Sequence, residues 1–304
     1  MFIIAQRRIW YTLSALMLIA SLAAMLIFGL RFGIDFTGGS ILEVQYTGVK
    51  PTPLEVTETL ESAGLTGVSV RATGDAGYLI RTPFLSPETY AAVRAGLGGT
   101  EVRYDAIGPA IGTELATRAI YAVLLVLISI ALFIAFAFRK VSKPVSSFKY
   151  GAVALLSLAH DVIIPLGAFA VMGVFLGAEV DTLFVTALLV ILGFSVHDTI
   201  VVFDRTRENL HTLAEEGRTE PFEETVGRSV SQTLARSINT SLTTVLALLA
   251  LYIWGPESTK FFTLTLLIGI IAGTYSSIFL ASPMLVTLQK LQRDVPSVDT
   301  KKKQ

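Results

Sequence analysis

The stretch GFSVHDTIVVFDRTREN, residues 193–209, decides the fold. It ends an apolar run that begins near Thr182, so we expect it to be the inner part of a membrane-spanning helix. Yet that run carries Ser195, His197, Asp198 and Thr199. A carboxylate in hydrocarbon costs about 2.5–3.5 kcal/mol even on the lenient insertion scale, so its default interpretation is functional. The alternative is that Asp198 only holds helices together by accepting hydrogen bonds.

The composition agrees with a membrane protein. Hydrophobic residues make up 52% of the 304 residues and charged residues 16%, which is typical of polytopic membrane proteins. Lys plus Arg equals Asp plus Glu, 24 of each, so the net charge gives no indication of nucleic acid as a partner. The absence of cysteine excludes a disulfide framework, thiolate metal sites and cysteine nucleophiles.

Six apolar runs are long enough to cross a bilayer, which takes about 20 residues of helix. They cover about residues 9–30, 118–138, 150–175, 182–203, 236–254 and 261–288. The first is longer than the core of a cleaved signal peptide, so we expect residues 1–30 to form an uncleaved transmembrane helix. Basic residues gather in alternate gaps: Arg7, Arg8, Arg139, Lys140, Lys143, Lys149, Arg205, Arg207, Arg218, Arg228, Lys290, Arg293 and three terminal lysines. The positive-inside rule therefore predicts that both termini lie in the cytoplasm.

Residues 31–117 read as a folded extracytoplasmic domain. ILEVQY (41–46), VSVRAT (68–73), YLIRTP (78–83) and residues 101–105 have the pattern of strands, and residues 53–63 and 87 onward that of helices. The order strand–helix–strand–strand–helix–strand predicts a small ferredoxin-like α+β module. The five later runs, residues 118–288, would form a transmembrane bundle.

The remaining polar segments are expected on the cytoplasmic side. Residues 204–235 are charged and helical in pattern, which favours an amphipathic connector on the membrane surface over a docking site for a cytosolic partner. Residues 289–304 read as a basic cytoplasmic tail.

Polar residues inside the spans suggest a relay. At about 1.5 Å per residue, Asp198 lies roughly 8 Å from the inner end of the fourth run, and Arg236 begins the antiparallel fifth run at a similar depth. An ion pair between them would make both charges tolerable. Arg236, Asn239, Thr240 and Thr243 recur every three or four residues, so they form one stripe that could face Asp198. Protonation of Asp198 would release the arginine and alter helix packing.

The doublets His160–Asp161 and His197–Asp198 also allow a metal-binding interpretation. Neighbouring residues on a helix point about 100° apart, however, and the i, i+3 or i+4 spacing of metal motifs is missing. We therefore predict no metal site. A hydrolase is disfavoured too, because the sequence lacks a nucleophile elbow, a zincin motif and a phosphate loop.

Four motifs in register resemble the SecF family of the bacterial Sec protein-export machinery. They are GIDFTGGS (33–40), the His-Asp doublet of the third run, DTIVVFDRTREN (198–209) and LARSINTSLTT (234–244). The matching residues of the first and third motifs include Gly33, Asp35, Phe36, Gly38, Gly39, Asp204 and Arg205. We call residues 33–40 the glycine segment; it would open the extracytoplasmic domain, with its paired glycines allowing a tight turn.

The resemblance implies a non-enzymatic accessory subunit in the cell inner membrane, with the architecture of the resistance-nodulation-division superfamily. Such a subunit works with SecD beside the SecYEG translocon and uses the proton-motive force to help draw the exported preprotein chain out on the far side of the membrane. Membrane lipids would surround its helices. The family's relay carboxylate falls on Asp198 and its companion arginine on Arg236. No cofactor is implied. The coupling ion would be a proton, with sodium as an open alternative, and a second acidic residue is expected on a partner subunit.

His197 departs from the resemblance, since many relatives have Asn there. Its imidazole could tune the pKa of the relay carboxylate or only form a hydrogen bond with a neighbouring helix. Asp161, next to His160, could be a second relay group or a helix-packing acceptor.

Three other functions stay open: a proton-driven exporter of small molecules or lipids in the same superfamily, a metal transporter, and a scaffold that moves no ions. A domain of about 85 residues is small for such an exporter.

Overall fold

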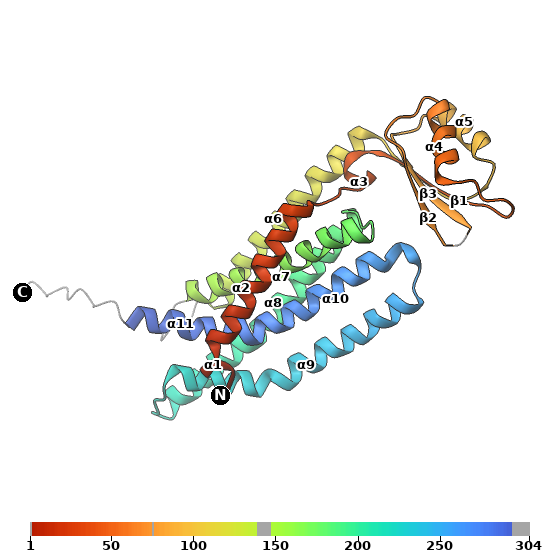
Figure 1. Cartoon of the computed structure of the whole chain (residues 1–304). Helices are drawn as coiled ribbons and strands as arrows, with labels where there is room; N and C mark the ends of the chain where they lie inside the picture. Colours follow the sequence, from red (N-terminus) through yellow and green to blue (C-terminus); the bar gives the residue numbers. More distant parts are fainter. Residues whose placement is uncertain (1, 75, 139–146, 294–304) are drawn as a thin grey trace, which may run out of the picture. The chain divides into compact units, whose positions relative to one another are not determined.

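The computed structural model describes residues 2–74, 76–138 and 147–293 (Figure 1). The chain forms two compact units. The α/β unit contains Arg31–Ala122 and Glu179–Thr182, and the helical unit contains the described residues of Met1–Leu30, Val123–Ala178 and Leu183–Gln304. The basic residues Arg139, Lys140 and Lys143, and the terminal lysines of the expected tail, lie outside the described residues.

The α/β unit is built on a four-stranded antiparallel sheet. Its strands are β1 (Gly39–Gln45), β2 (Ser69–Thr73), β3 (Gly77–Thr82) and β4 (Thr100–Ile107), in the order β2-β3-β1-β4. Helix α4 (Pro53–Ser62) connects β1 to β2, and α5 (Pro87–Leu97) connects β3 to β4. The sequence therefore predicted the order of strands and helices correctly.

Apolar residues of the sheet and its two helices form the core of this unit. Leu42 and Val44 alternate along β1 and are fully buried, as the period of two in a strand requires. They belong to one cluster with Leu60 of α4, Ile80 of β3 and Val93 of α5. Helices α4 and α5 thus cover one face of the sheet and bury the apolar side chains that alternate along its strands.

A loop from elsewhere in the chain completes the α/β unit. Residues Glu179–Thr182 follow the third apolar run, yet Val180 forms a parallel bridge with Phe32. Glu179 also makes an ion pair with Arg81 of β3. Burial, followed by the charge of Arg71, lowers the pKa of Arg81 to about 10, so the guanidinium stays protonated at neutral pH and keeps this pair.

Six helices in the described part of the chain are long and apolar enough to cross a membrane. The first five are α2 (Arg7–Phe28), α6 (Pro109–Ala137), α7 (Ser147–Phe175), α8 (Thr182–Glu215) and α9 (Phe222–Trp254). The sixth is composite: α10 (Lys260–Tyr275), the π-helical η2 (Ser276–Ala281) and α11 (Ser282–Arg293). The short α1 (Phe2–Ala5), α3 (Ile34–Thr37) and η1 (Glu257–Thr259) complete the elements. In this unit α2 packs along α7, and α10 packs against α7 and α9.

The segment 204–235, which the sequence predicted to be helical, extends the two neighbouring helices α8 and α9. Helix α8 continues into it as far as Glu215, because residues 204–216 contain no Gly or Pro; Gly217 then takes a φ of +63°. Helix α9 then begins at Phe222, directly after Pro221. The Asn209 amide of α8 donates to Ser229 Oγ of α9 at 2.8 Å, so the two extensions pack on each other.

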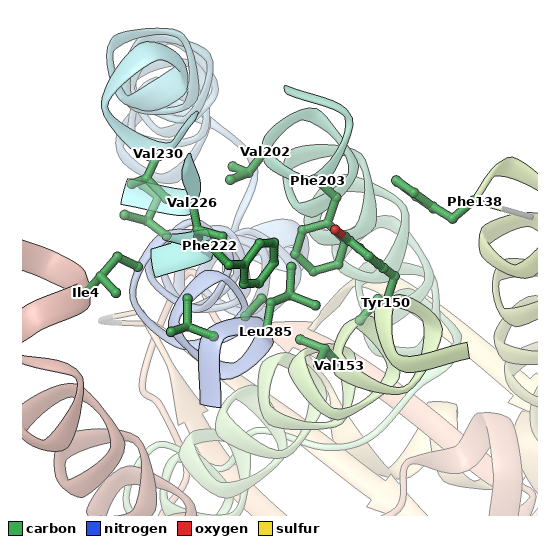
Figure 2. Close-up of a cluster of buried hydrophobic side chains, with 14 of the residues drawn as sticks. Ile4, Phe138, Tyr150, Val153, Val202, Phe203, Phe222, Val226, Val230 and Leu285 are labelled. Atoms are coloured by element: carbon green, nitrogen blue, oxygen red, sulfur yellow. The ribbon is translucent and has the colours of Figure 1, made fainter. Parts of the chain in front are cut away.

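An apolar cluster holds together the helices near this α8–α9 turn (Figure 2). Phe203 of α8 lies edge-on to Tyr150 of α7, whose ring stacks on Phe138 with 5.2 Å between centroids. At the same end, Glu223 of α9 accepts from Arg7 at 3.0 Å and pairs with Lys290 of α11. One carboxylate therefore links the first, fifth and last helices.

The N-terminus of α4 provides a test of the α/β unit. Thr52 Oγ1 accepts the amide of Glu55, and the Glu55 carboxylate accepts the amide of Thr52 at 2.7 Å, a capping box. Thr52→Ala should therefore cost about 1 kcal/mol locally and speed hydrogen exchange of the α4 amides about fivefold at pH 7. Glu58→Gln, an exposed change on the same helix, is the control.

This effect should depend on pH. The hydrogen bonds from the Thr52 amide and then its hydroxyl lower the pKa of Glu55. Stabilisation from a carboxylate with a lowered pKa is present above its ordinary value and is lost as pH falls through the lowered one. The exchange difference between Thr52→Ala and the parent should therefore narrow below about pH 4; a difference that stayed constant would contradict the role of the Glu55 charge.

Candidate functional site

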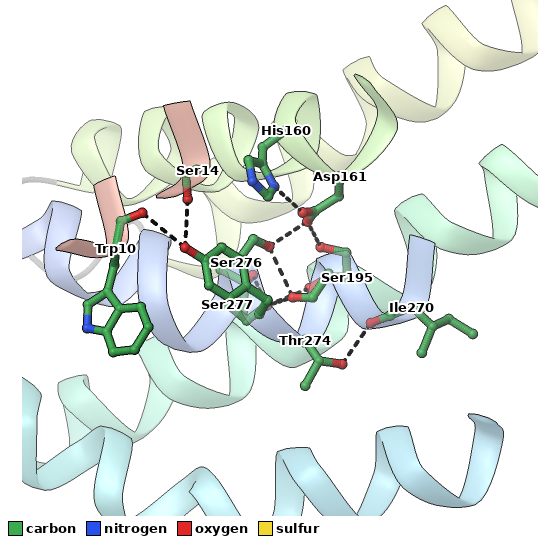
Figure 3. A network of polar contacts seen from close by, with 12 residues as sticks. Trp10, Ser14, His160, Asp161, Ser195, Ile270, Thr274, Ser276 and Ser277 are labelled. Carbon is green, nitrogen blue, oxygen red and sulfur yellow. Dashed lines mark hydrogen bonds and ion pairs between the residues drawn. The ribbon is translucent and has the colours of Figure 1, made fainter. Parts of the chain in front are cut away.

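Asp161 lies at the centre of a buried polar network (Figure 3). Its side chain is 0% exposed. One carboxylate oxygen lies 2.9 Å from Nδ1 of His160, and the other accepts from Ser276 Oγ at 2.7 Å and from Ser195 Oγ. An ionised carboxylate can only accept, so an ionised Asp161 requires the proton of this contact on Nδ1 of His160. These bonds connect α7 with α8 and η2.

The π-helical turn η2 positions two serines at this network. Ser276 bonds to Asp161, and the adjacent Ser277 lies 2.8 Å from Thr199 Oγ1 of α8. Such turns widen a helix by one residue and are frequent at functional sites. A Cβ at Gly273 would lie only 3.0 Å from Ser195 Cβ, so the glycine allows the close approach of α10 and α8. The sequence predicted an uninterrupted sixth helix, because its apolar run shows no local signal for a π-helical turn.

Asp198 has a different environment from Asp161. It is 7% exposed, and its Oδ1 accepts from Ser237 Oγ of α9 at 2.5 Å. Its Oδ2 is buried and has no hydrogen-bond partner among the described residues. Buried polar atoms are nearly always paired, so an open acceptor on a buried carboxylate calls for an explanation.

The expected ion pair between Asp198 and Arg236 is not formed among the described residues. Ser237 bonds to the carboxylate instead, and Arg236 is exposed. The reason is helix phase: neighbouring residues point about 100° apart, and Ser237 belongs to the buried stripe of α9 with Thr233 and Ser241. The predicted stripe, which starts at Arg236, lies beside this buried stripe, one residue position further around α9. Its members Asn239, Thr240 and Thr243 are exposed.

Arg236 and Asp198 nevertheless line the same cavity of about 240 Å³, with Phe194, His197, Val201 and Thr240. A water molecule takes about 30 Å³, so this space has room for several. A second cavity of about 280 Å³ is lined by Arg236 and Val201 as well, together with Asp204, Arg205, Glu208, Gln232 and Thr233. His197 is exposed on α8.

The remaining predicted residues lie in two places. Asp204 and Arg205 form ion pairs within α8, with Arg207 at 2.6 Å and Glu208 at 2.6 Å. In the glycine segment, Asp35 Oδ2 accepts from the amide of Thr182 at 2.9 Å and from its hydroxyl at 2.6 Å. Phe36 lies edge-on to Phe32, with 6.4 Å between ring centroids. Gly33, Gly38 and Gly39 all permit close backbone approaches.

Sequence reasoning missed Ser237 and Ser241, although their spacing from Thr233 by four residues was a usable signal. Ser241 Oγ lies 2.5 Å from Thr274 Oγ1 of α10. Among the described residues, no three His, Asp or Glu side chains gather closely enough to suggest a metal site.

The fold and the site together define a class. This is a polytopic helical protein with a small α/β unit after its first helix and two buried carboxylates, held by hydroxyls, within its helical unit.

Comparisons with known proteins identify the family. Residues 92–291 match the model of the protein export membrane protein SecD/SecF, C-terminal, and residues 23–48 match the SecD/SecF GG motif. The chain belongs to the SecD/SecF family.

Two relatives match over nearly the full length of both chains. A protein translocase subunit SecF from Thermobaculum terrenum is 44% identical, over 94% of this chain and 93% of its own. Another, from Anaerolinea thermophila, is 40% identical, over 93% and 92%. A crystal structure of SecDF, a translocon-associated membrane protein from Thermus thermophilus, matches with a TM-score of 0.80 at 33% identity. That match covers 95% of this chain, which spans 38% of the longer SecDF chain.

The network around Asp161 gives a stability prediction. Asp161→Ala would leave the His160 and Ser195 donors unpaired in the interior, at about 1–3 kcal/mol for each, while Ser276 Oγ keeps its bond to the carbonyl of Gly273. The purified full chain in detergent should therefore unfold at a clearly lower temperature, whereas Asp161→Asn, which keeps one acceptor oxygen, should lose less. Asn239→Ala, an exposed change, is the control and should stay within about 0.5 kcal/mol of the parent. An Asp161→Ala midpoint equal to that of the control would contradict the network.

Proposed function

We propose that this chain is the SecF-type membrane subunit of the Sec preprotein translocase and promotes protein export with SecD. The matched relatives are translocase subunits that align with the chain along nearly its full length. The single observation that carries a mechanism is the unpartnered Oδ2 of Asp198, a residue that lines the same cavity as Arg236. A small-molecule or lipid exporter of the same superfamily is not favoured, because the matched proteins are export-machinery subunits.

Asp198 would be the group that takes up and releases the coupling proton. Ser237 holds Oδ1 in place, while the buried Oδ2, which has no hydrogen-bond partner among the described residues, would receive a proton once a movement lets water from the cavity reach it. When Asp198 is ionised, it attracts the guanidinium of Arg236, the cation that lines the same cavity. Each charge moved through the membrane potential contributes about 2.3 kcal/mol per 100 mV. Uptake and release would thus alternate two arrangements of α8 and α9.

The other predicted relay residues receive different roles. Asp161 already has three hydrogen-bond donors, including His160, so we infer that it mainly holds α7, α8 and η2 together and is the weaker candidate for a second relay group. His197, Asn239 and Thr240 are exposed on α8 and α9. They would line the water path or meet the partner subunit, which we expect to supply a second carboxylate.

The proposed setting follows from the charge pattern and the fold. Both termini and the α8–α9 turn would lie in the cytoplasm, and the α/β unit, with the ferredoxin-like strand order, would lie outside the inner membrane. The domains would be residues 1–30, 31–117, 118–288 and 289–304. Partners would be SecD, SecYEG, the preprotein and membrane lipids. The protein would act without enzymatic activity or cofactor, with the proton as coupling ion and sodium as the alternative to test.

The test is export in cells whose only copy carries Asp198→Asn. Asparagine keeps the shape and an acceptor oxygen but cannot carry the charge. Conversion of a secreted precursor to its mature form should slow as much as in a strain without the protein. Glu215→Gln, an exposed change on the same helix, should export normally at equal membrane levels.

Two outcomes would contradict parts of this proposal. Normal export by Asp198→Asn would reduce Asp198 to helix packing and leave the scaffold function standing. If export depends on the sodium gradient and continues after the proton gradient is collapsed, the coupling ion is sodium and not the proton.

A further inference from the structure

We propose that Asp35 is a positioning residue of the proton-driven cycle, which attaches the outer end of the relay helix α8 to the α/β unit. This inference rests on the function proposed above, because it concerns how movement at Asp198 reaches the rest of the protein.

The first support is the bonding of Asp35 to the first residue of α8. Its Oδ2 accepts both the amide and the hydroxyl of Thr182, at 2.9 and 2.6 Å. A carboxylate that binds a backbone amide at a helix N-terminus satisfies an otherwise unpaired donor and meets the positive end of the helix dipole. The two residues are 147 positions apart, so this cap is a tertiary contact.

The second support is the backbone pairing beside this cap. The Val180 amide donates to the carbonyl of Arg31 at 2.7 Å, and the Gly33 amide donates to the carbonyl of Val180 at 2.8 Å. A Cβ at Gly33 would lie 3.3 Å from that carbonyl, so the close approach favours glycine. Together with the ion pair of Arg81 and Glu179, these bonds make Glu179–Thr182 part of the α/β unit.

The third support is the other end of the glycine segment. Gly38 has a φ of +74°, and a Cβ there would lie 2.7 Å from the Cα of Pro109, the first residue of α6. A Cβ on Gly112 would likewise lie 2.7 Å from the Gly38 amide nitrogen. The segment therefore holds the first turn of α6 as closely as it holds the start of α8.

The consequence is a mechanical path along one helix. Asp198 lies about 24 Å from Thr182 along α8, at about 1.5 Å per residue. Because α8 is continuous from Thr182 to Glu215, a shift at Asp198 moves its first residue too. The bonds of Asp35 would pass that shift to the α/β unit, which is the part expected to face the exported chain.

Export kinetics give the first test. Asp35→Ala should slow precursor conversion about fivefold, the effect of losing one helix cap on a coupled equilibrium. Asp35→Asn, which keeps an acceptor, should be intermediate, and Glu58→Gln, an exposed change in the same unit, should be unaffected.

Since the chain has no cysteine, Asp35→Cys with Thr182→Cys can be joined in the folded protein by a short bifunctional thiol reagent. Joining should restore export; no restoration, or normal export by Asp35→Ala, would overturn the proposal.

Spin-label distances separate coupling from folding. The full chain is reconstituted with a cysteine-free SecD and labelled at Leu54→Cys and His211→Cys, which report on the α/β unit and α8. A second pair, His211→Cys and Trp254→Cys, reports on α8 against α9. In the parent, an imposed proton gradient should shift both distances. In Asp35→Ala, only the second pair should respond.

The outcomes distinguish this inference from the proposed function. If both pairs still respond in Asp35→Ala, the attachment proposed here is wrong and the proton-driven cycle stands. If neither pair responds in the parent, the proton-driven movement itself is wrong, and this inference falls with it.

Discussion

Burial of two carboxylates among apolar helices is the constraint on which the helical unit depends. A buried charge is tolerated only where donors surround it, and each hydrogen bond to a charged group contributes about 1.5–3 kcal/mol. Asp161 meets this condition fully, with donors from its own helix, from α8 and from η2. Asp198 meets it only in part, with Ser237 on one oxygen. The first carboxylate therefore has both oxygens bonded, whereas the second keeps one oxygen without a partner among the described residues.

Serine hydroxyls from neighbouring helices bond to both carboxylates, because these helices approach each other closely. Gly273 brings the backbone of α10 against Ser195, and the serines reach their partners with the shortest side chain that can donate. Ser237 of α9 bonds to Asp198, whereas Arg236, one position around α9, lines the cavity. A cation beside the site, and not bonded within it, can respond to the charge of Asp198 without breaking the packing.

The sequence allowed good predictions wherever the signal was local. Alternating strand residues, helical patterns and long apolar runs gave the order of the α/β unit and the six spanning helices, since each depends on near neighbours. The depth estimate also brought Asp198 to the correct turn of α9. It placed Arg236 rather than Ser237 opposite Asp198, an error of one residue position around α9. The sequence alone does not give this, because tertiary packing decides which face of α9 is buried. The π-turn η2 and the cap of Thr182 by Asp35 were out of reach for the same reason.

Helix α8 combines these features, and its contacts limit how it can move. Thr182 is held by Asp35, Ser195 donates to Asp161, and Thr199 contacts Ser277. Ser195 and Thr199 are four residues apart and share one face, while Asp198 reaches Ser237 on another side of the helix. Rotation of α8 by one residue position, about 100°, would break all of these bonds together. A small tilt or shift can lengthen the single bond of Asp198 while the Ser195 and Thr199 contacts act as a pivot. If a change of charge at Asp198 moves α8, as we propose, this geometry favours a tilt of the helix over its rotation.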